Sequence, residues 1–134
     1  MFYCRFEVYK ALHGDIKNLG DVTQVDFTEF TDVDMIAGGF PCQAFSISGK
    51  RMGFEDTRGT MFYHFARAIN DIKPKFFIWE NVKGILSHDN GKTIRVILEV
   101  LSGLGYEITL DLLNAKDYDV PQSRERVFCI GKRI

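Results

Sequence analysis

The stretch MIAGGFPCQAFS, residues 35–46, is the part of the chain from which the rest is best interpreted. Its apolar start, residues 35–40, predicts a strand, and the lack of polar alternation is typical of a strand buried on both faces of a parallel sheet. The following turn carries Cys42 out of the strand on a loop, where a nucleophilic thiol would lie. The alternative is a small cysteine that fills space in the core. The remaining sequence has to separate these two interpretations.

Strand and helix patterns alternate along the chain. Beyond the 35–40 strand, the periodicity predicts helices at 61–72 and 92–101, a second apolar strand at 76–79 and two further strands at 106–113 and 127–131. Weaker patterns indicate a short helix at 2–12 and a short strand or strand end at 20–25. This order predicts an α/β fold with right-handed crossovers.

Composition bounds the kind of protein. The chain has 134 residues, 46% hydrophobic and 26% charged, which suits one compact domain rather than a disordered chain. The net charge of −1 gives no overall basic field, although a local basic patch is sufficient to contact phosphates. Three widely spaced cysteines predict neither a disulfide framework nor a zinc site. We therefore expect a cytoplasmic protein without a signal peptide or membrane span.

Polar side chains follow the predicted strand ends. Cys42 follows the 35–40 strand and Glu80 follows the 76–79 strand, so both would emerge at one rim if these strands are parallel neighbours. A thiol and a carboxylate there could act as nucleophile and proton handler. Arg124 and Arg126 precede the last strand and share a face if that strand already extends there. Alternatively, Glu80 is a surface cap or ion-pair partner and the two arginines form a solvated edge.

Three sequence blocks distinguish between these alternatives, namely GFPCQ at 39–43, ENV at 80–82 and QSRER at 122–126. In this order and spacing they resemble the signature blocks of the DNA cytosine-5 methyltransferases, and among these the bacterial enzymes of restriction-modification systems. The connecting segments at 45–50, 53–56 and 87–91 also match the pattern of this family. The resemblance runs from about residue 20 to the C-terminus. It implies a partial Rossmann-like S-adenosylmethionine-dependent methyltransferase fold, with a mostly parallel sheet and an antiparallel C-terminal strand.

The resemblance also implies catalytic roles. Cys42 would add to C6 of the target cytosine, after which C5 takes a methyl group from S-adenosylmethionine. Glu80 would bind the base at N3 and the exocyclic amine, offsetting charge that develops in the ring. Arg126 would hold the cytosine O2, and Arg124 would support the same pocket. The base would have to be flipped out of the duplex, since C6 is inaccessible inside the stack.

Weaker implied assignments concern the cofactor and double-stranded DNA. The cofactor residues would be Asp21, Val22, Pro41 and Met61. The DNA contacts would come from a loop over 43–60, through Gln43, Ser46, Ser48, Lys50 and Arg58. A Gly-Asp pair is also common turn chemistry, and Met61 would pack in a helix core in any case.

The chain departs from the family pattern at both ends. The Gly-rich loop that cradles the cofactor is absent, as is the target-recognition domain, so residues 1–134 resemble a single truncated catalytic domain that is inactive alone. The 35–40 strand would then be an exposed apolar edge. We expect it to pair with another copy or a complementing chain. The alternative function is a non-catalytic remnant that binds DNA or a partner.

Overall fold

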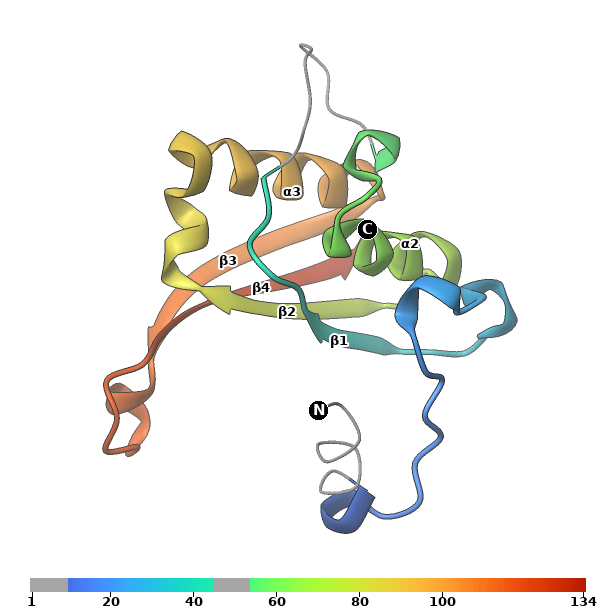
Figure 1. The fold of residues 1–134 in the computed structure, drawn as a ribbon, viewed down its shortest axis with the longest axis horizontal. Helices are drawn as coiled ribbons and strands as arrows, with labels where there is room; N and C mark the ends of the chain where they lie inside the picture. Colours follow the sequence, from blue (N-terminus) through green and yellow to red (C-terminus); the bar gives the residue numbers. More distant parts are fainter. Residues whose placement is uncertain (1–9, 45–53) are drawn as a thin grey trace.

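A computed structural model describes residues 10–44 and 54–134 (Figure 1). Its main elements are β1 (Met35–Gly39), α2 (Met61–Ile72), β2 (Phe76–Val82), α3 (Lys92–Gly103), β3 (Tyr106–Asn114) and β4 (Glu125–Arg133). Short 3-10 turns lie between them, among them η1 (Val22–Gln24) and η2 (Phe27–Glu29). The two long helices and the later strands confirm the sequence pattern to within a few residues at each end.

The four strands form one sheet in the order β1-β2-β4-β3. β1 and β2 are parallel, whereas β4 is antiparallel to both of its neighbours. The α/β class and the antiparallel C-terminal strand are confirmed. The parallel share is smaller than expected, because residues 115–124 are too short a connection for a crossover and return β4 antiparallel to β3.

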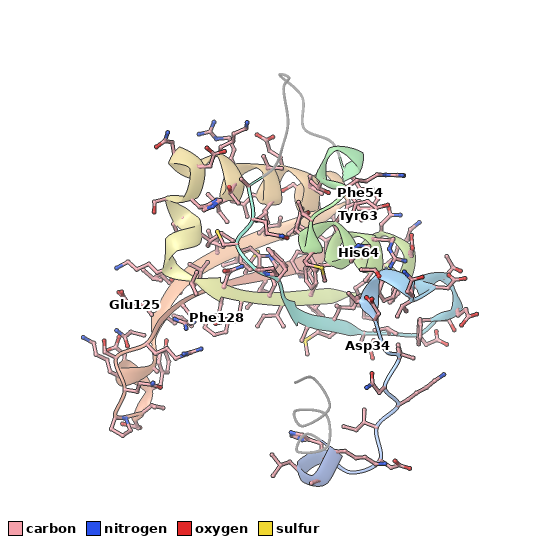
Figure 2. The ribbon with its side chains drawn as sticks, in the orientation of Figure 1. Asp34, Phe54, Tyr63, His64, Glu125 and Phe128 are labelled. Carbon is pink, nitrogen blue, oxygen red and sulfur yellow. The ribbon has the colours of Figure 1, made fainter. Side chains whose placement is uncertain are left out.

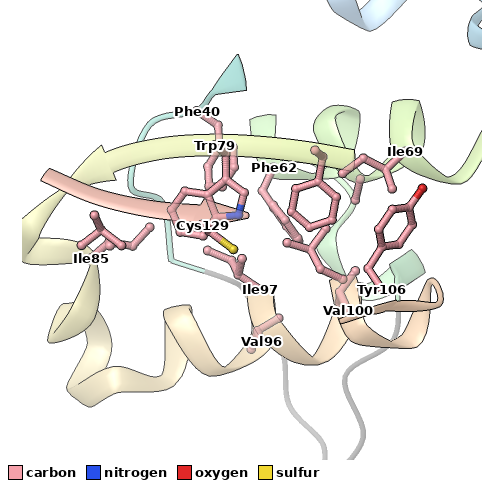
Figure 3. Packing of buried hydrophobic residues seen from close by; sticks show 14 residues of the cluster. Phe40, Phe62, Ile69, Trp79, Ile85, Val96, Ile97, Val100, Tyr106 and Cys129 are labelled. Atoms are coloured by element: carbon pink, nitrogen blue, oxygen red, sulfur yellow. The ribbon is translucent and has the colours of Figure 1, made fainter. Parts of the chain in front are cut away.

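Both long helices pack on the same face of the sheet (Figures 1 and 3). Helix α2 is capped at its N-terminus by Thr60, whose side chain accepts a hydrogen bond from the Tyr63 N–H, and its C-cap is Lys73 in the left-handed conformation. Between the helices and the sheet lies a core of large apolar side chains, including Phe40, Phe62, Ile69, Phe77, Trp79, Ile97 and Tyr106. This core fixes the strand ends that carry the candidate site.

One glycine in β4 is required by the core. Gly131 lies opposite Phe77 in the β2–β4 ladder, and Phe77 is fully buried. A Cβ atom at Gly131 would stand 2.0 Å from the Phe77 ring. The ring therefore occupies the space above the glycine, and a larger residue cannot enter without displacing it.

The opposite face of the sheet is open in the part of the chain that the structure describes. Its apolar side chains are partly exposed, with Met35 at 59%, Phe76 at 42%, Val82 at 45% and Ile130 at 47%. The expectation that the 35–40 strand is buried on both faces is wrong, because β1 is the edge of the sheet and only the Phe40 side chain beyond it is buried. The expected exposed apolar edge is confirmed.

Two local expectations differ from the structure, and a third is tested only in part. Residues 20–25 form no strand, since the Asp21 side chain caps η1 instead. Strand β2 continues to Val82, so Glu80 lies within it rather than after it. Of the helix expected at 2–12, residues 10–13 are helical and residues 1–9 lie outside the described part. Within the described ranges, no helix has the length and apolar character needed to cross a membrane.

Candidate active site

Cys42 lies just beyond the end of β1, on the side of the sheet that the helices cover. It is half-buried and packs against the core. Cys42 lines a narrow crevice. The other lining residues are Phe40, Pro41, Gln43, Thr60, Phe62, Ile85, Thr93 and Ile97. Burial raises the pKa of the Cys42 thiol above its ordinary value, so the protonated form dominates at neutral pH. In this conformation the Cys42 thiol lies at the strand end where the nucleophile is expected, but it is protonated.

Asn81 holds the strand end that carries Cys42. Its Nδ2 donates to the Phe40 carbonyl oxygen at 2.7 Å, and its Oδ1 accepts from the Val82 N–H at 2.9 Å. Asn81 is only 6% exposed, so these bonds replace water that its amide would otherwise need. Asn81 belongs to the 80–82 block, but the sequence patterns assign it no role of its own. A polar residue on the buried face of an otherwise apolar strand was the available signal.

Gln43 continues the connection from Cys42 to α2. Its Oε1 accepts a hydrogen bond from the Met61 N–H at 3.0 Å, which satisfies one of the free amides in the first turn of the helix. Met61 is 36% exposed, and Pro41 lies in the crevice beside Cys42. The predicted DNA contact Gln43 and the predicted cofactor contact Met61 are therefore joined directly.

Glu80 lies on the opposite face of β2 from its neighbours Trp79 and Asn81, because side chains alternate along a strand. Its Oε1 is 2.9 Å from Nε of Arg126 in β4. The ion pair borders an open pocket of about 540 Å³. The other residues of this pocket are Leu113, Asn114, Ala115, Tyr118, Val120, Arg124 and Phe128. The structure thus brings Glu80, Arg124 and Arg126 together, as the sequence blocks predict.

The turn between β3 and β4 shapes one side of this pocket. The Asn114 Oδ1 accepts from the Arg124 N–H at 3.0 Å, which closes the base of the turn. Lys83 forms an ion pair with Glu125 at 2.9 Å and ties the end of β2 to the start of β4. Figure 2 shows Glu125 and Phe128 where this turn joins the sheet. A hydrogen bond and an ion pair, rather than core packing, therefore hold this side of the pocket in position.

Cys42 and Glu80 lie at the same rim but border different cavities. β1 and β2 are parallel neighbours, and Gly39 pairs with Glu80 three residues before Cys42. Cys42 lines the crevice under the helices, whereas Glu80 lines the open pocket on the other face. The two side chains are not in one pocket in this conformation.

Asp21 and Val22 lie at η1, a separate segment that packs near α2. The Asp21 Oδ1 accepts from both the N–H and the Oγ1 of Thr23, each at 2.9 Å. The backbone hydrogen bond from Thr23 is the main reason why the pKa of Asp21 lies below its ordinary value. An ionised carboxylate with one oxygen already oriented is suited to accept a hydrogen bond from a ligand amine.

The remaining predicted DNA contacts are only partly described. Ser46, Ser48 and Lys50 lie outside the described residues. Arg58 is exposed, and its guanidinium carbon lies 5.7 Å from the centre of the Tyr63 ring. Among the described residues, no group of three or more His, Cys, Asp or Glu side chains could hold a metal ion.

Comparison with known proteins identifies the family. The sequence profile of the C-5 cytosine-specific DNA methylases matches residues 4–134, and the chain belongs to this family. It is 53% identical over 116 residues to the type II methyltransferase M.Eco47II of Escherichia coli, covering 85% of this chain and 28% of that protein. It is 49% identical over 124 residues to the type II methyltransferase M.HhaI of Haemophilus parahaemolyticus, covering 92% and 38%.

The fold is likewise that of a solved methyltransferase. The Dnmt2 methyltransferase of S. pombe superposes with a TM-score of 0.71 at 23% identity, covering 95% of this chain and 39% of that chain. The chain therefore spans between about a quarter and two fifths of the length of these relatives. The methyltransferase fold predicted from the sequence blocks is confirmed.

Proposed function

We propose that this chain carries the catalytic residues of a DNA cytosine-5 methyltransferase of the restriction-modification type, acting in the bacterial cytoplasm. One observation carries the proposal. Glu80 and Arg126, from two of the three sequence blocks, form a 2.9 Å ion pair at the rim where the strand bearing Cys42 ends. A carboxyl group and a guanidinium side by side can bind the Watson–Crick edge of a flipped cytosine, because the carboxyl can share a proton with N3 and accept from the exocyclic amine while the guanidinium donates to O2.

The proposed reaction begins at Cys42. Its thiolate forms a bond to C6 of the cytosine, and the electron pair of the C5–C6 double bond becomes available at C5. Glu80 in its protonated form donates to N3 and Arg126 donates to O2, which offsets the charge that develops in the ring. After methylation at C5, a water molecule takes the C5 proton, and the electron pair of the C5–H bond restores the double bond and expels the Cys42 thiolate. Arg124 supports the pocket from the turn before β4.

The thiol must move and ionise for this to occur. Cys42 and Glu80 border different cavities, and burial holds the thiol in its protonated form. DNA binding would have to bring the Cys42 sulfur to the pocket side, with Gln43, Ser46, Ser48, Lys50 and Arg58 as phosphate or groove contacts.

The cofactor residues fit the adenine end of S-adenosylmethionine. Asp21 has one oriented carboxylate oxygen, Val22 is half-buried, and Met61 presents a partly exposed apolar side chain on α2. These groups would hold the adenine amine and ring face, with Pro41 on the side nearer Cys42. When bound, the cofactor supplies an electrophilic methyl group.

The exposed edge of the sheet supports a further part of the proposal. Strand β1 has a paired neighbour on one side only, and Met35 and Phe76 beside it are largely exposed. We expect residues 35–40 to be covered by a second copy or by a complementing chain. Solution scattering that shows a monodisperse monomer of this chain would count against this expectation.

Covalent trapping tests the function. DNA of mixed sequence containing 5-fluorocytosine is incubated with the chain and S-adenosylmethionine, because fluorine at C5 prevents release of the enzyme. The reaction is run with the chain alone and with the flanking segments of the H. parahaemolyticus relative. With the flanking segments present, we expect an adduct on Cys42 that is resistant to denaturation, absent in Cys42→Ser and reduced at least about a hundredfold in Glu80→Gln, whereas the chain alone should form none.

The alternative is a protein that binds DNA or a partner without methyl transfer. The protonated, core-packed Cys42 thiol is the observation that favours it. DNA binding without any trapped adduct, even with the flanking segments present, would reject the catalytic proposal and support this alternative.

A further inference from the structure

Arg67, in the middle of α2, makes an unusual set of contacts with the segment that contains η1 and η2. Its Nη1 donates to the Val25 carbonyl oxygen at 2.7 Å, and its Nη2 donates to the Val22 carbonyl oxygen at 2.9 Å. Both bonds join residues more than 40 positions apart in the sequence. The Arg67 guanidinium therefore connects residues 22–25 to the middle of α2.

Two further contacts fix the position of the guanidinium. Its carbon lies 4.6 Å from the centre of the Phe27 ring, and Phe27 is buried. Nη2 also lies 3.4 Å from Nδ1 of His64, one turn earlier on α2. Burial and the neighbouring Arg67 charge lower the pKa of His64, so its ring is neutral and can accept at Nδ1. Figure 2 shows His64 on α2 next to this segment.

Besides the Arg67 bonds, η2 packs on α2, and Asp34 at the end of the segment is paired with Lys75. The hydrogen bonds within this segment are local, from Thr23 to Asp21, from Thr28 to Asp26 and from Phe30 to Phe27. Within the described residues, Phe27 is the one side chain of residues 10–34 that is buried. Charge-assisted bonds to two carbonyls at a partly buried site are stronger than neutral ones.

Met61 is the first residue of the same helix. The Arg67 bonds therefore attach the segment that carries Asp21 and Val22 to the helix that carries Met61. We propose that Arg67 is a positioning residue that holds Asp21 and Val22 against α2, so that they and Met61 form one adenine-binding surface. This inference rests on the proposed function for the identity of the ligand. Arg67 bonds the Val22 carbonyl oxygen, so the half-buried Val22 side chain and the exposed Asp21 carboxylate remain available to a ligand.

Hydrogen–deuterium exchange of the chain without ligand tests the positioning. In Arg67→Gln, we expect the amides of Thr23, Gln24, Thr28 and Phe30 to exchange at least about tenfold faster, because the segment loses its attachment to α2. Arg67→Lys should fall in between, since one ammonium cannot reach both carbonyls in the planar arrangement. Arg95→Gln, at an exposed arginine of α3, is the control and should leave these amides unchanged.

Equilibrium binding of S-adenosylhomocysteine tests the link to the ligand. We expect Arg67→Gln to raise the Kd about tenfold, with Arg95→Gln unchanged. Unchanged exchange in Arg67→Gln overturns the positioning role whatever the affinity. Faster exchange with an unaltered Kd overturns the assignment of this segment to the adenine site. No binding by the unsubstituted chain overturns the proposed cofactor site in this chain, while the exchange rates still decide the role of Arg67.

Discussion

Consecutive residues of β2 serve two regions that differ in how they are held together. Trp79 and Asn81 face the helices, where they pack against the core and bond the strand end before Cys42. Glu80, between them, faces the open side and pairs with Arg126 beside a wide pocket. The helix-covered region is held by packing and buried hydrogen bonds, and the open region by exposed ion pairs. Substitutions on the first should therefore change stability, and substitutions on the second should change binding and chemistry.

The largest effect is expected at Gly131, on the helix-covered side. A Cβ atom 2.0 Å from the Phe77 ring forces the ring out of its site, so Gly131→Ala should lower the free energy of unfolding by about 3 kcal/mol. Urea denaturation monitored by Trp79 fluorescence measures this. Gly103→Ala is the matched control, because a Cβ there meets nothing within 4 Å and alanine favours a helix. Equal stability of the two variants would contradict the packing described for β2 and β4.

Asn81→Ala should have the next largest effect. Removing the amide leaves the buried Phe40 carbonyl oxygen without its donor, which should cost about 2 kcal/mol of unfolding free energy. Loosening of the same strand end should also speed alkylation of Cys42 by iodoacetamide, read by mass spectrometry of its peptide. A stability loss without faster alkylation would show that Asn81 supports the core but does not hold Cys42.

Glu80→Gln provides the contrasting case on the open side. Its partner Arg126 is partly exposed and remains solvated when the carboxylate is removed, so unfolding free energy should fall by less than about 1 kcal/mol. The same denaturation experiment checks this beside Asn81→Ala. A loss as large as that of Asn81→Ala would remove the distinction between the two faces of β2.

The smallest change concerns the pH dependence of Cys42. Burial raises the pKa of its thiol, so a smaller fraction is thiolate at neutral pH than in an exposed cysteine. Because the thiolate is the reactive form, alkylation should be slower than that of a cysteine peptide at pH 7 and should rise at higher pH than the peptide rate does. Coincident pH profiles would show that the crevice does not hold the thiol protonated.

The fold class followed from the sequence because its main signals are local. Local patterns indicate which segments bury one face. They are the helical spacing over 61–72 and 92–101 and the apolar runs at 76–79 and 127–131, and both helices are present as expected. The wrong expectation for the 35–40 strand has the same origin. An apolar run records a preference for burial, but only the order of strands in the sheet decides whether a neighbour is present to cover it.

The sequence by itself determined the family, since three short blocks in order suffice to recognise it, and it named Cys42, Glu80, Arg124 and Arg126 as candidates. Tertiary structure decided how these residues are arranged. Alternation along β2 separates Glu80 from the side on which Cys42 packs, and a bond across 41 positions assigns Asn81 to the strand end. The attachment made by Arg67 has no periodic signal, because its acceptors are backbone carbonyls that any residue provides. Contacts between distant segments depend on how elements pack, and no local pattern of side chains encodes them.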